Sequence, residues 1–165
     1  MKKLLVLTTG GTLDKVYFDA LSEFQVGAPV AGDILQRMNV ALDVELIEVC
    51  RKDSLELTDG DREKLKSIIE SSSAQRILIT HGTDTMVNSA KTIGEQAGKV
   101  IVFTGAMQPA AFTNTDAIFN IGTAVGALMS PNTPDGCYIA MSGQVYGADD
   151  VKKNYDSKRF ETTNP

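Results

Sequence analysis

The sequence predicts a three-layer α/β domain, in which helices cover both faces of a mostly parallel sheet. Two observations carry this prediction. Short apolar runs of strand type recur along the chain, and most are continuous rather than alternating, as is typical of strands covered on both sides. Segments with helical spacing lie between these runs, and this alternation indicates parallel crossover connections. The length of 165 residues fits one domain, which we place at residues 1–165.

Five apolar runs are expected to form the strands, namely residues 4–7, 44–49, 76–80, 100–104 and 137–141. Four intervening segments carry apolar side chains at helical spacing, namely residues 29–39, 62–71, 85–97 and 116–129. Pro29 suits the first turn of its helix, and Thr58 and its neighbours supply N-capping side chains for the next one. We expect a last helix to begin near Asp149.

Residues 14–27 form a fairly polar connection with three aromatic side chains and no evident helix or strand pattern. A connection of this length is often a lid over a site, and the alternative is an ordinary surface loop. The lid is the interpretation that we carry forward.

The composition restricts the possible partners. A net charge of −5 argues against an electrostatic footprint for nucleic acid or for an anionic membrane. Cys50 and Cys137 are too few for a disulfide framework, so we expect buried, reduced thiols. No stretch approaches a membrane span, and the apolar run after Lys2 and Lys3 is too short for a secretory signal. We therefore expect a cytoplasmic protein.

Two threonine-rich loops carry the functional signal. Residues 8–12 (TTGGT) follow the first predicted strand, and residues 80–85 (THGTDT) follow the third. Ligands of open parallel sheets bind at the carboxyl ends of the strands, so both loops are expected to line one site. Hydroxyl side chains in such a site point to an enzyme of acyl transfer.

Each loop also has a purely structural interpretation. Paired glycines before Thr12 allow a sharp turn, and Thr12 becomes a nucleophile only with a base nearby. Thr83 and Thr85 could cap a helix, whose dipole would favour Asp84 near its start. Capping does not explain why so many hydroxyls crowd into six positions. His81, the only histidine, is expected to be a packed or hydrogen-bonded residue rather than a catalyst.

Five motifs, taken together and in this order, resemble the bacterial-type L-asparaginase and glutaminase family. They are TGGTL at 9–13, Asp53-Ser54, THGTDTM at 80–86, TGAM at 104–107 with Pro109, and DVKKN at 150–154. The resemblance implies the N-terminal, flavodoxin-like domain of that fold, which bears the catalytic threonines.

The resemblance implies a role for each catalytic residue. Thr12 is the nucleophile, and Thr83 is the second catalytic threonine beside Lys153, which a desolvated site would make a base. Asp84 either orients the lysine or binds the substrate ammonium. Tyr17, five residues after Thr12, is assigned the role of the lid tyrosine.

The resemblance also implies how the substrate is held. Ser54 binds the α-carboxylate, although turn capping would otherwise explain it. The remaining predicted contacts are Gly11, Asp53, Gly82 and Ala106, and backbone amides near Thr12 and Thr83 would each stabilise the oxyanion by about 3 kcal/mol. No metal or organic cofactor is implied.

The chain departs from the family pattern at three points. Family members are commonly about twice this length, with a second domain that completes a neighbour's site, so the chain is either a short form or a fragment. Leu55 stands where many members have glutamine, and the lid segment has Phe24 without a phenol. We therefore expect weak affinity for asparagine.

We expect hydrolysis of L-asparagine to L-aspartate and ammonia by a homo-oligomer, a dimer or a tetramer. Two alternatives stay open. One is an amidase acting on glutamine or another amide, and the other is a non-catalytic domain that binds a small carboxylate.

Overall fold

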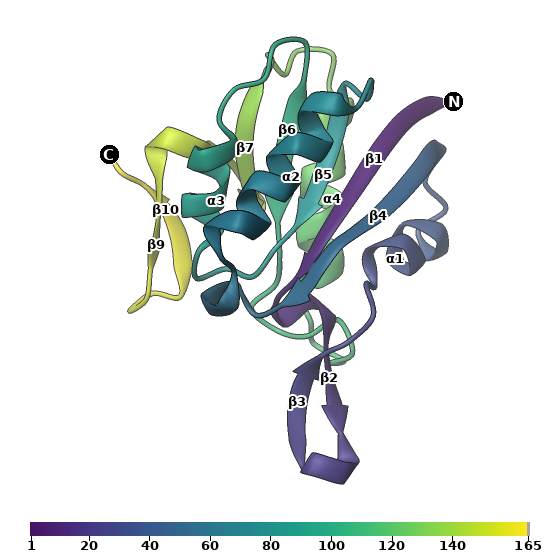
Figure 1. The fold of residues 1–165 in the computed structure, drawn as a ribbon, viewed down its shortest axis with the longest axis vertical. Helices are drawn as coiled ribbons and strands as arrows, with labels where there is room; N and C mark the ends of the chain where they lie inside the picture. Colours follow the sequence, from purple (N-terminus) through teal and green to yellow (C-terminus); the bar gives the residue numbers. More distant parts are fainter. Residues whose placement is uncertain (165) are drawn as a thin grey trace.

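The computed structural model describes residues 1–164 and has a six-stranded sheet with helices on both faces (Figure 1). All neighbouring strands are parallel except the last pair, in which β8 runs antiparallel to β7. This confirms the predicted three-layer, mostly parallel fold. In spatial order the strands are β4 (Leu42–Lys52), β1 (Lys2–Gly10), β5 (Arg76–Thr80), β6 (Val100–Thr104), β7 (Gly136–Met141) and β8 (Gln144–Gly147).

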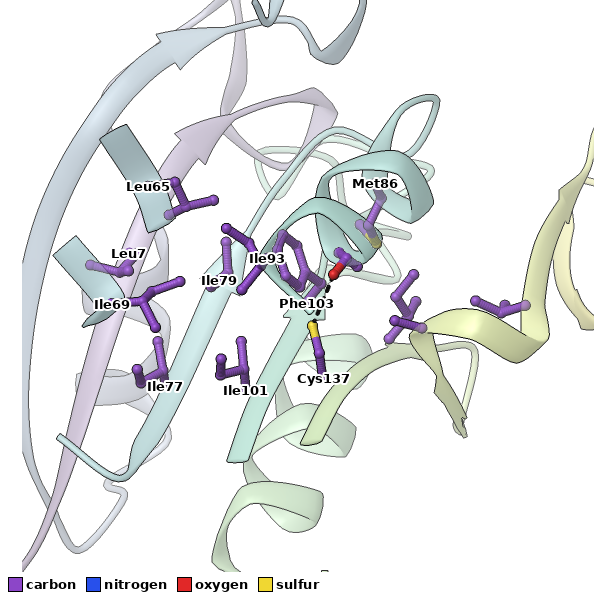
Figure 2. Close-up of a cluster of buried hydrophobic side chains, with 14 of the residues drawn as sticks. Leu7, Leu65, Ile69, Ile77, Ile79, Met86, Ile93, Ile101, Phe103 and Cys137 are labelled. Carbon is purple, nitrogen blue, oxygen red and sulfur yellow. Dashed lines mark hydrogen bonds between the residues drawn. The ribbon is translucent and has the colours of Figure 1, made fainter. Parts of the chain in front are cut away.

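Four helices form the outer layers, as predicted. They are α1 (Ala31–Arg37), α2 (Asp59–Ser71), α3 (Met86–Ile93) and α4 (Ala117–Met129). Alternate residues of each buried strand face opposite layers, so Leu7 packs with α2 and α3 while Val6 packs with α1 and α4. Figure 2 shows the first cluster, in which side chains of β1, β5 and β6 point toward Leu65 and Ile69 of α2 and Met86 and Ile93 of α3.

Local signals explain where the helices begin and end. The predicted capping of α2 is confirmed, because the Thr58 hydroxyl accepts from Asp61 N–H and the Asp61 carboxylate accepts from Thr58 N–H. The predicted third helix was too long at its end. It stops at Ile93 because Gly94 has a φ of 63° and donates its N–H back to Ala90 O.

The helix predicted near Asp149 is wrong. A short 3-10 turn, Ala148–Asp150, leads into an antiparallel hairpin of β9 (Val151–Asn154) and β10 (Arg159–Thr162). The Asn154 side chain accepts the N–H groups of Asp156 and Ser157, which reverses the chain, and Phe160 then anchors β10 in the core. These tertiary contacts decide the structure of a segment whose own pattern is weak.

The connection at residues 14–27 is not structureless, which corrects the sequence interpretation. It is a hairpin of β2 (Lys15–Phe18) and β3 (Glu23–Val26), joined by the 3-10 turn Asp19–Leu21. In Figure 1 it projects from the body of the domain at the end of β1. The two strands are short and their faces are exposed, so neither has the buried apolar run by which the other strands were found.

Both cysteines carry free thiols. Cys137 is buried as expected, whereas Cys50 is only half-buried because β4 is an edge strand with alternating exposure. Within residues 1–164, no helix is long and apolar enough to cross a membrane.

Candidate active site at the carboxyl ends of β1 and β5

Three loops lie in close contact at one end of the sheet. A Cβ atom added at Gly11 would overlap the backbone nitrogen and Cα of Gly82. A Cβ added at Gly82 would lie 2.6 Å from Ser54 Cβ and 2.8 Å from Ser54 Oγ. Glycine is therefore required at both positions for the loops to approach this closely. The contacts bring together three of the residues predicted to hold the substrate.

The β1 loop is shaped for this approach. Gly10 and Gly11 have φ values of 102° and 87°, which are accessible to glycine at little cost. Gly11 N–H donates to Lys52 O at 2.9 Å, and the Thr9 hydroxyl donates to Thr80 O at 2.9 Å. The half-buried Thr12 then opens a 3-10 turn that ends at Asp14.

Thr83, Asp84 and Lys153 form a second, tightly connected group. Lys153 Nζ lies 2.8 Å from Thr83 Oγ1 and 2.6 Å from Asp84 Oδ1. Lys153 comes from β9, so the hairpin that the sequence did not predict delivers the amine to the threonine loop. Thr83 is buried, and the Lys153 side chain is 13% exposed, whereas the Asp84 side chain is 31% exposed, so solvent reaches the pair from the side of Asp84.

Neither Thr83 nor Thr85 caps α3 with its side chain. Thr85 is the N-cap residue of α3, yet the helix has no side-chain cap. Its hydroxyl instead donates to Ser54 O at 2.8 Å and fixes the neighbouring loop. Hydroxyls that capping would have explained thus serve contacts between loops.

The segment around Ser54 is also well fixed. Asp53, rather than Ser54, caps the 3-10 turn Ser54–Glu56, and Ser54 itself is buried. Lys15 Nζ lies 2.8 Å from Asp53 Oδ2, which lowers the pKa of that carboxyl and ties the base of the β2–β3 hairpin to this loop. Leu55, in contrast, is 73% exposed.

The two remaining predicted residues lie in different settings. Ala106 is buried just after β6, in the cluster beneath α4. Tyr17 is exposed on β2, with its ring edge-on to Phe24 at 5.4 Å between centroids. Phe24 in turn contacts Phe112, from the connection after β6, at 5.5 Å. An aromatic contact therefore holds the hairpin against a loop at the same end of the sheet.

Sequence reasoning missed two residues beside this site. Tyr155 follows Lys153 by two positions, and Lys153 Nζ lies 4.7 Å from its ring centroid, within the range of a cation–π contact. Partial burial and the nearby Asp84 carboxylate raise the pKa of its phenol. The only available signal was an aromatic residue close to the predicted lysine.

Asp14 is the second missed residue. Its carboxylate accepts from Val30 N–H at 3.0 Å, and its backbone oxygen accepts from Gly27 N–H at 2.8 Å. Asp14 N–H donates to Gly11 O, so one residue joins the Thr12 turn to the exit of the hairpin and to α1. Burial raises the pKa of Asp14 to about 6. Oδ2 is buried and has no partner within residues 1–164.

A family model described as the N-terminal asparaginase domain matches residues 3–164. The chain belongs to the asparaginase family. This confirms the resemblance on which the site prediction was built.

Known proteins agree with this assignment. The chain is 27% identical over 162 residues to a probable periplasmic L-asparaginase of Haemophilus influenzae, covering 93% of this chain and 46% of that protein. It is 28% identical over 170 residues to a glutaminase-asparaginase of Acinetobacter glutaminasificans, covering 91% and 49%. The thermostable L-asparaginase of Thermococcus kodakarensis has the same fold, with a TM-score of 0.80 and 26% identity over 99% of this chain and 52% of that one. The chain thus spans about half the length of the curated relatives it matches.

Proposed function

We propose that residues 1–165 form the catalytic domain of an amidohydrolase that converts L-asparagine to L-aspartate and ammonia. The contact of Lys153 Nζ with both Thr83 Oγ1 and Asp84 Oδ1 is the observation that carries this proposal. A buried threonine beside a lysine is an arrangement that activates a hydroxyl or a water molecule. The backbone contact of Gly11 with Gly82 supports the placement of Thr12 at the same site.

In the proposed first step, Thr12 Oγ bonds to the carbon of the side-chain amide. The hydroxyl proton passes to a base, and the carbon–nitrogen bond breaks as the nitrogen takes up a proton and leaves as ammonia. Water then attacks the resulting ester, which releases aspartate and regenerates the Thr12 hydroxyl. Thr83 and Lys153 supply the base in one or both steps, and Tyr17 covers the site from the hairpin.

Substrate recognition is proposed to use the loops that meet at Gly82. The Ser54 hydroxyl binds the α-carboxylate, with Gly11, Asp53, Gly82 and Ala106 around the substrate. Asp84 orients Lys153, which its short contact favours, or binds the α-ammonium of the substrate. Leu55 offers no polar group, which supports weak affinity for asparagine.

Several further properties belong to the same proposal. The reaction needs no metal or organic cofactor, since nucleophile, base and oxyanion donors are sufficient for amide hydrolysis. We propose a cytoplasmic homo-oligomer, a dimer or a tetramer, that binds neither nucleic acid nor membrane. The net charge of −5 supports the last point.

Glutamine is the second candidate substrate, because one relative is a glutaminase-asparaginase. The deciding experiment measures ammonia release from asparagine and from glutamine by wild type, Thr12→Ala and Thr92→Ala. Thr92 is an exposed threonine whose hydroxyl donates within α3, so its variant is a matched control. We expect activity in wild type and in the control, and a loss of at least ~100-fold in Thr12→Ala. Equal background rates in all three proteins would instead indicate a non-catalytic carboxylate-binding domain.

A further inference from the structure

A buried chain of hydrogen bonds runs beneath the Gly82 loop. Arg62 Nε lies 2.9 Å from Ser89 Oγ, which lies 2.8 Å from His81 Nε2. The other ring nitrogen, His81 Nδ1, lies 2.6 Å from Gly82 O. The exposed fractions of Arg62, Ser89 and His81 are 6%, 0% and 1%, so water does not compete for these bonds. The chain links α2, α3 and the loop after β5.

Chemistry fixes the direction of every bond in this chain. Gly82 O can only accept, so His81 Nδ1 must carry a hydrogen. A neutral imidazole then presents a lone pair at Nε2, and the Ser89 hydroxyl must donate to it. A guanidinium can only donate, so Arg62 Nε supplies the hydrogen that Ser89 Oγ accepts. All four groups are satisfied by one assignment of hydrogens.

The surroundings keep the histidine in this neutral form. Burial, reinforced by the positive charge of Arg62, lowers the pKa of His81 to about 4. Its ring packs edge-on to Phe103, with 5.8 Å between centroids. Arg62 is itself held by Leu57 O at 3.5 Å and by the exposed Asp59 Oδ1 at 3.3 Å.

The acceptor at the end of the chain belongs to the candidate site. Gly82 O and Thr83 N–H are parts of one planar peptide group, so fixing the direction of the carbonyl also fixes the direction of the N–H. The same glycine contacts Gly11 and Ser54, and Thr83 contacts Lys153. Rotation of this peptide would therefore disturb both groups of the site at once.

We propose that Arg62, Ser89 and His81 are positioning residues that lock the Gly82–Thr83 peptide in the orientation the reaction requires. The effect on reaction rate rests on the proposed function, whereas the hydrogen assignment does not. Sequence reasoning had already set His81 apart from the catalysts. In this proposal His81 links the loop to α2 and α3 through hydrogen bonds, so that the two helices fix the orientation of the Gly82–Thr83 peptide.

Nitrogen-15 NMR of the imidazole tests the assignment without reference to activity. We expect wild-type His81 to hold the Nδ1–H tautomer between pH 5.5 and 8, an interval about 1.5 units or more above its pKa. In Ser89→Ala the Nδ1–H tautomer is expected to persist, because Gly82 O still requires a donor, while the nitrogen-15 shift of Nε2 moves on loss of the Ser89 hydrogen bond and hydrogen exchange at Thr83 N–H becomes faster. An Nε2–H tautomer in wild type, or an Nε2 shift and a Thr83 N–H exchange rate in Ser89→Ala that both equal those of wild type, would overturn the proposal.

Steady-state kinetics test the consequence for the reaction. We expect kcat to fall ~10-fold in Ser89→Ala with a smaller change in KM, because a displaced peptide affects the transition state more than binding. His81→Asn retains a donor near the position of Nδ1 and is expected to keep kcat within ~3-fold of wild type, whereas His81→Ala falls ~10-fold or more. Equal kcat values for His81→Asn and His81→Ala would contradict the proposed role. Thr92→Ala again serves as the control on α3.

The two proposals fail in different ways. A wild-type protein that holds the Nδ1–H tautomer and releases no ammonia from any small amide would overturn the proposed function. An active wild type with the other tautomer would overturn the positioning chain alone.

Discussion

The amine of Lys153 lies 2.8 Å from the hydroxyl of Thr83, although 70 positions separate the two residues in the chain. The β9–β10 hairpin makes this possible, because Phe160 is buried in the core and holds the hairpin against the sheet. Asp84 accepts a second hydrogen bond from the same amine at 2.6 Å, which leaves its direction little freedom. The fold itself therefore holds the three side chains in one arrangement, which the proposed reaction requires.

Replacing Lys153 with methionine tests this group. The change keeps the length and most of the volume of the side chain but removes the amine beside Thr83. General acid–base groups contribute typically 10²–10⁴-fold, so we expect kcat for ammonia release to fall by at least ~100-fold. Lys152→Met is the matched control, because Lys152 is exposed on the same strand and should leave the rate unchanged. Equal losses in both variants would show that general disruption of β9, rather than the amine, causes the effect.

Replacing Leu55 with glutamine tests the expected weak affinity. Leu55 follows Ser54 and is 73% exposed, so a longer polar side chain fits there without loss of packing. An added hydrogen bond to the substrate is worth about 1 kcal/mol, and we expect KM for asparagine to fall ~5-fold with little change in kcat. Leu46→Gln, an exposed leucine on the edge strand β4, is the control. A KM already in the micromolar range for wild type would refute the premise.

Replacing Phe112 with alanine should free the β2–β3 hairpin. Phe112 packs edge-on against Phe24 at 5.5 Å and joins the hairpin to the connection after β6. Aromatic pairs contribute about 0.5–1.5 kcal/mol beyond burial, so we expect amide hydrogen exchange in residues 15–26 to rise ~3–10-fold. Phe119→Ala removes another exposed ring, on α4, and should leave that exchange unaltered. Unchanged exchange in Phe112→Ala would mean that Lys15–Asp53 and Asp14 hold the hairpin alone.

Replacing Asp14 with asparagine should change how stability depends on pH. Because burial raises its pKa from 3.8 to about 6, folded Asp14 keeps a proton over an interval in which the unfolded chain has released it. The protonated carboxyl contributes fully to the free energy of unfolding below about pH 4. This contribution is lost as the pH rises through about 6, and the loss amounts to up to about 3 kcal/mol. Asparagine retains the acceptor for Val30 N–H and does not ionise.

The corresponding measurement is the free energy of unfolding in urea at pH 4, 5, 6 and 7. We expect Asp14→Asn to gain stability relative to wild type as the pH rises through this range, while Thr92→Ala, which removes no ionisable group, runs parallel to wild type. The variant and wild type must be compared at each pH, because His81 also makes stability depend on pH. Burial lowers the pKa of His81 to about 4, so the free energy of unfolding rises with pH between about 4 and 6.5 in both proteins. Parallel curves for Asp14→Asn would contradict the buried carboxyl's role.

The sequence predicted best where local pattern and burial agree. The bounds of β5 and β6 were predicted to the residue, because each is a continuous apolar run covered on both faces. β9 and β10 were missed since their form depends on the distant anchoring of Phe160 and on the turn at Asn154. The β2–β3 hairpin was missed because both of its faces are exposed.

The candidate site was predicted by motif order rather than by spacing. Nothing in the sequence near Lys153 indicates that it meets Thr83, and only the family resemblance joined them. Asp14, Arg62 and Ser89 were not predicted, and for His81 the sequence predicted burial or hydrogen bonding without naming its partners. Their importance comes from burial and from single hydrogen bonds, which depend on the packing of whole elements.

Gly11, Gly82 and Ser54 lie in close contact, and this sets where the proposed site can be redesigned. A side chain at either glycine would push two strand ends apart, so the floor of the site cannot be recontoured by substitution. New substrate preferences must instead come from the rim, where Leu55, Tyr155 and the hairpin face solvent. Under the proposed function, substrate preference would therefore be altered at these exposed positions, while the two glycines stay unchanged.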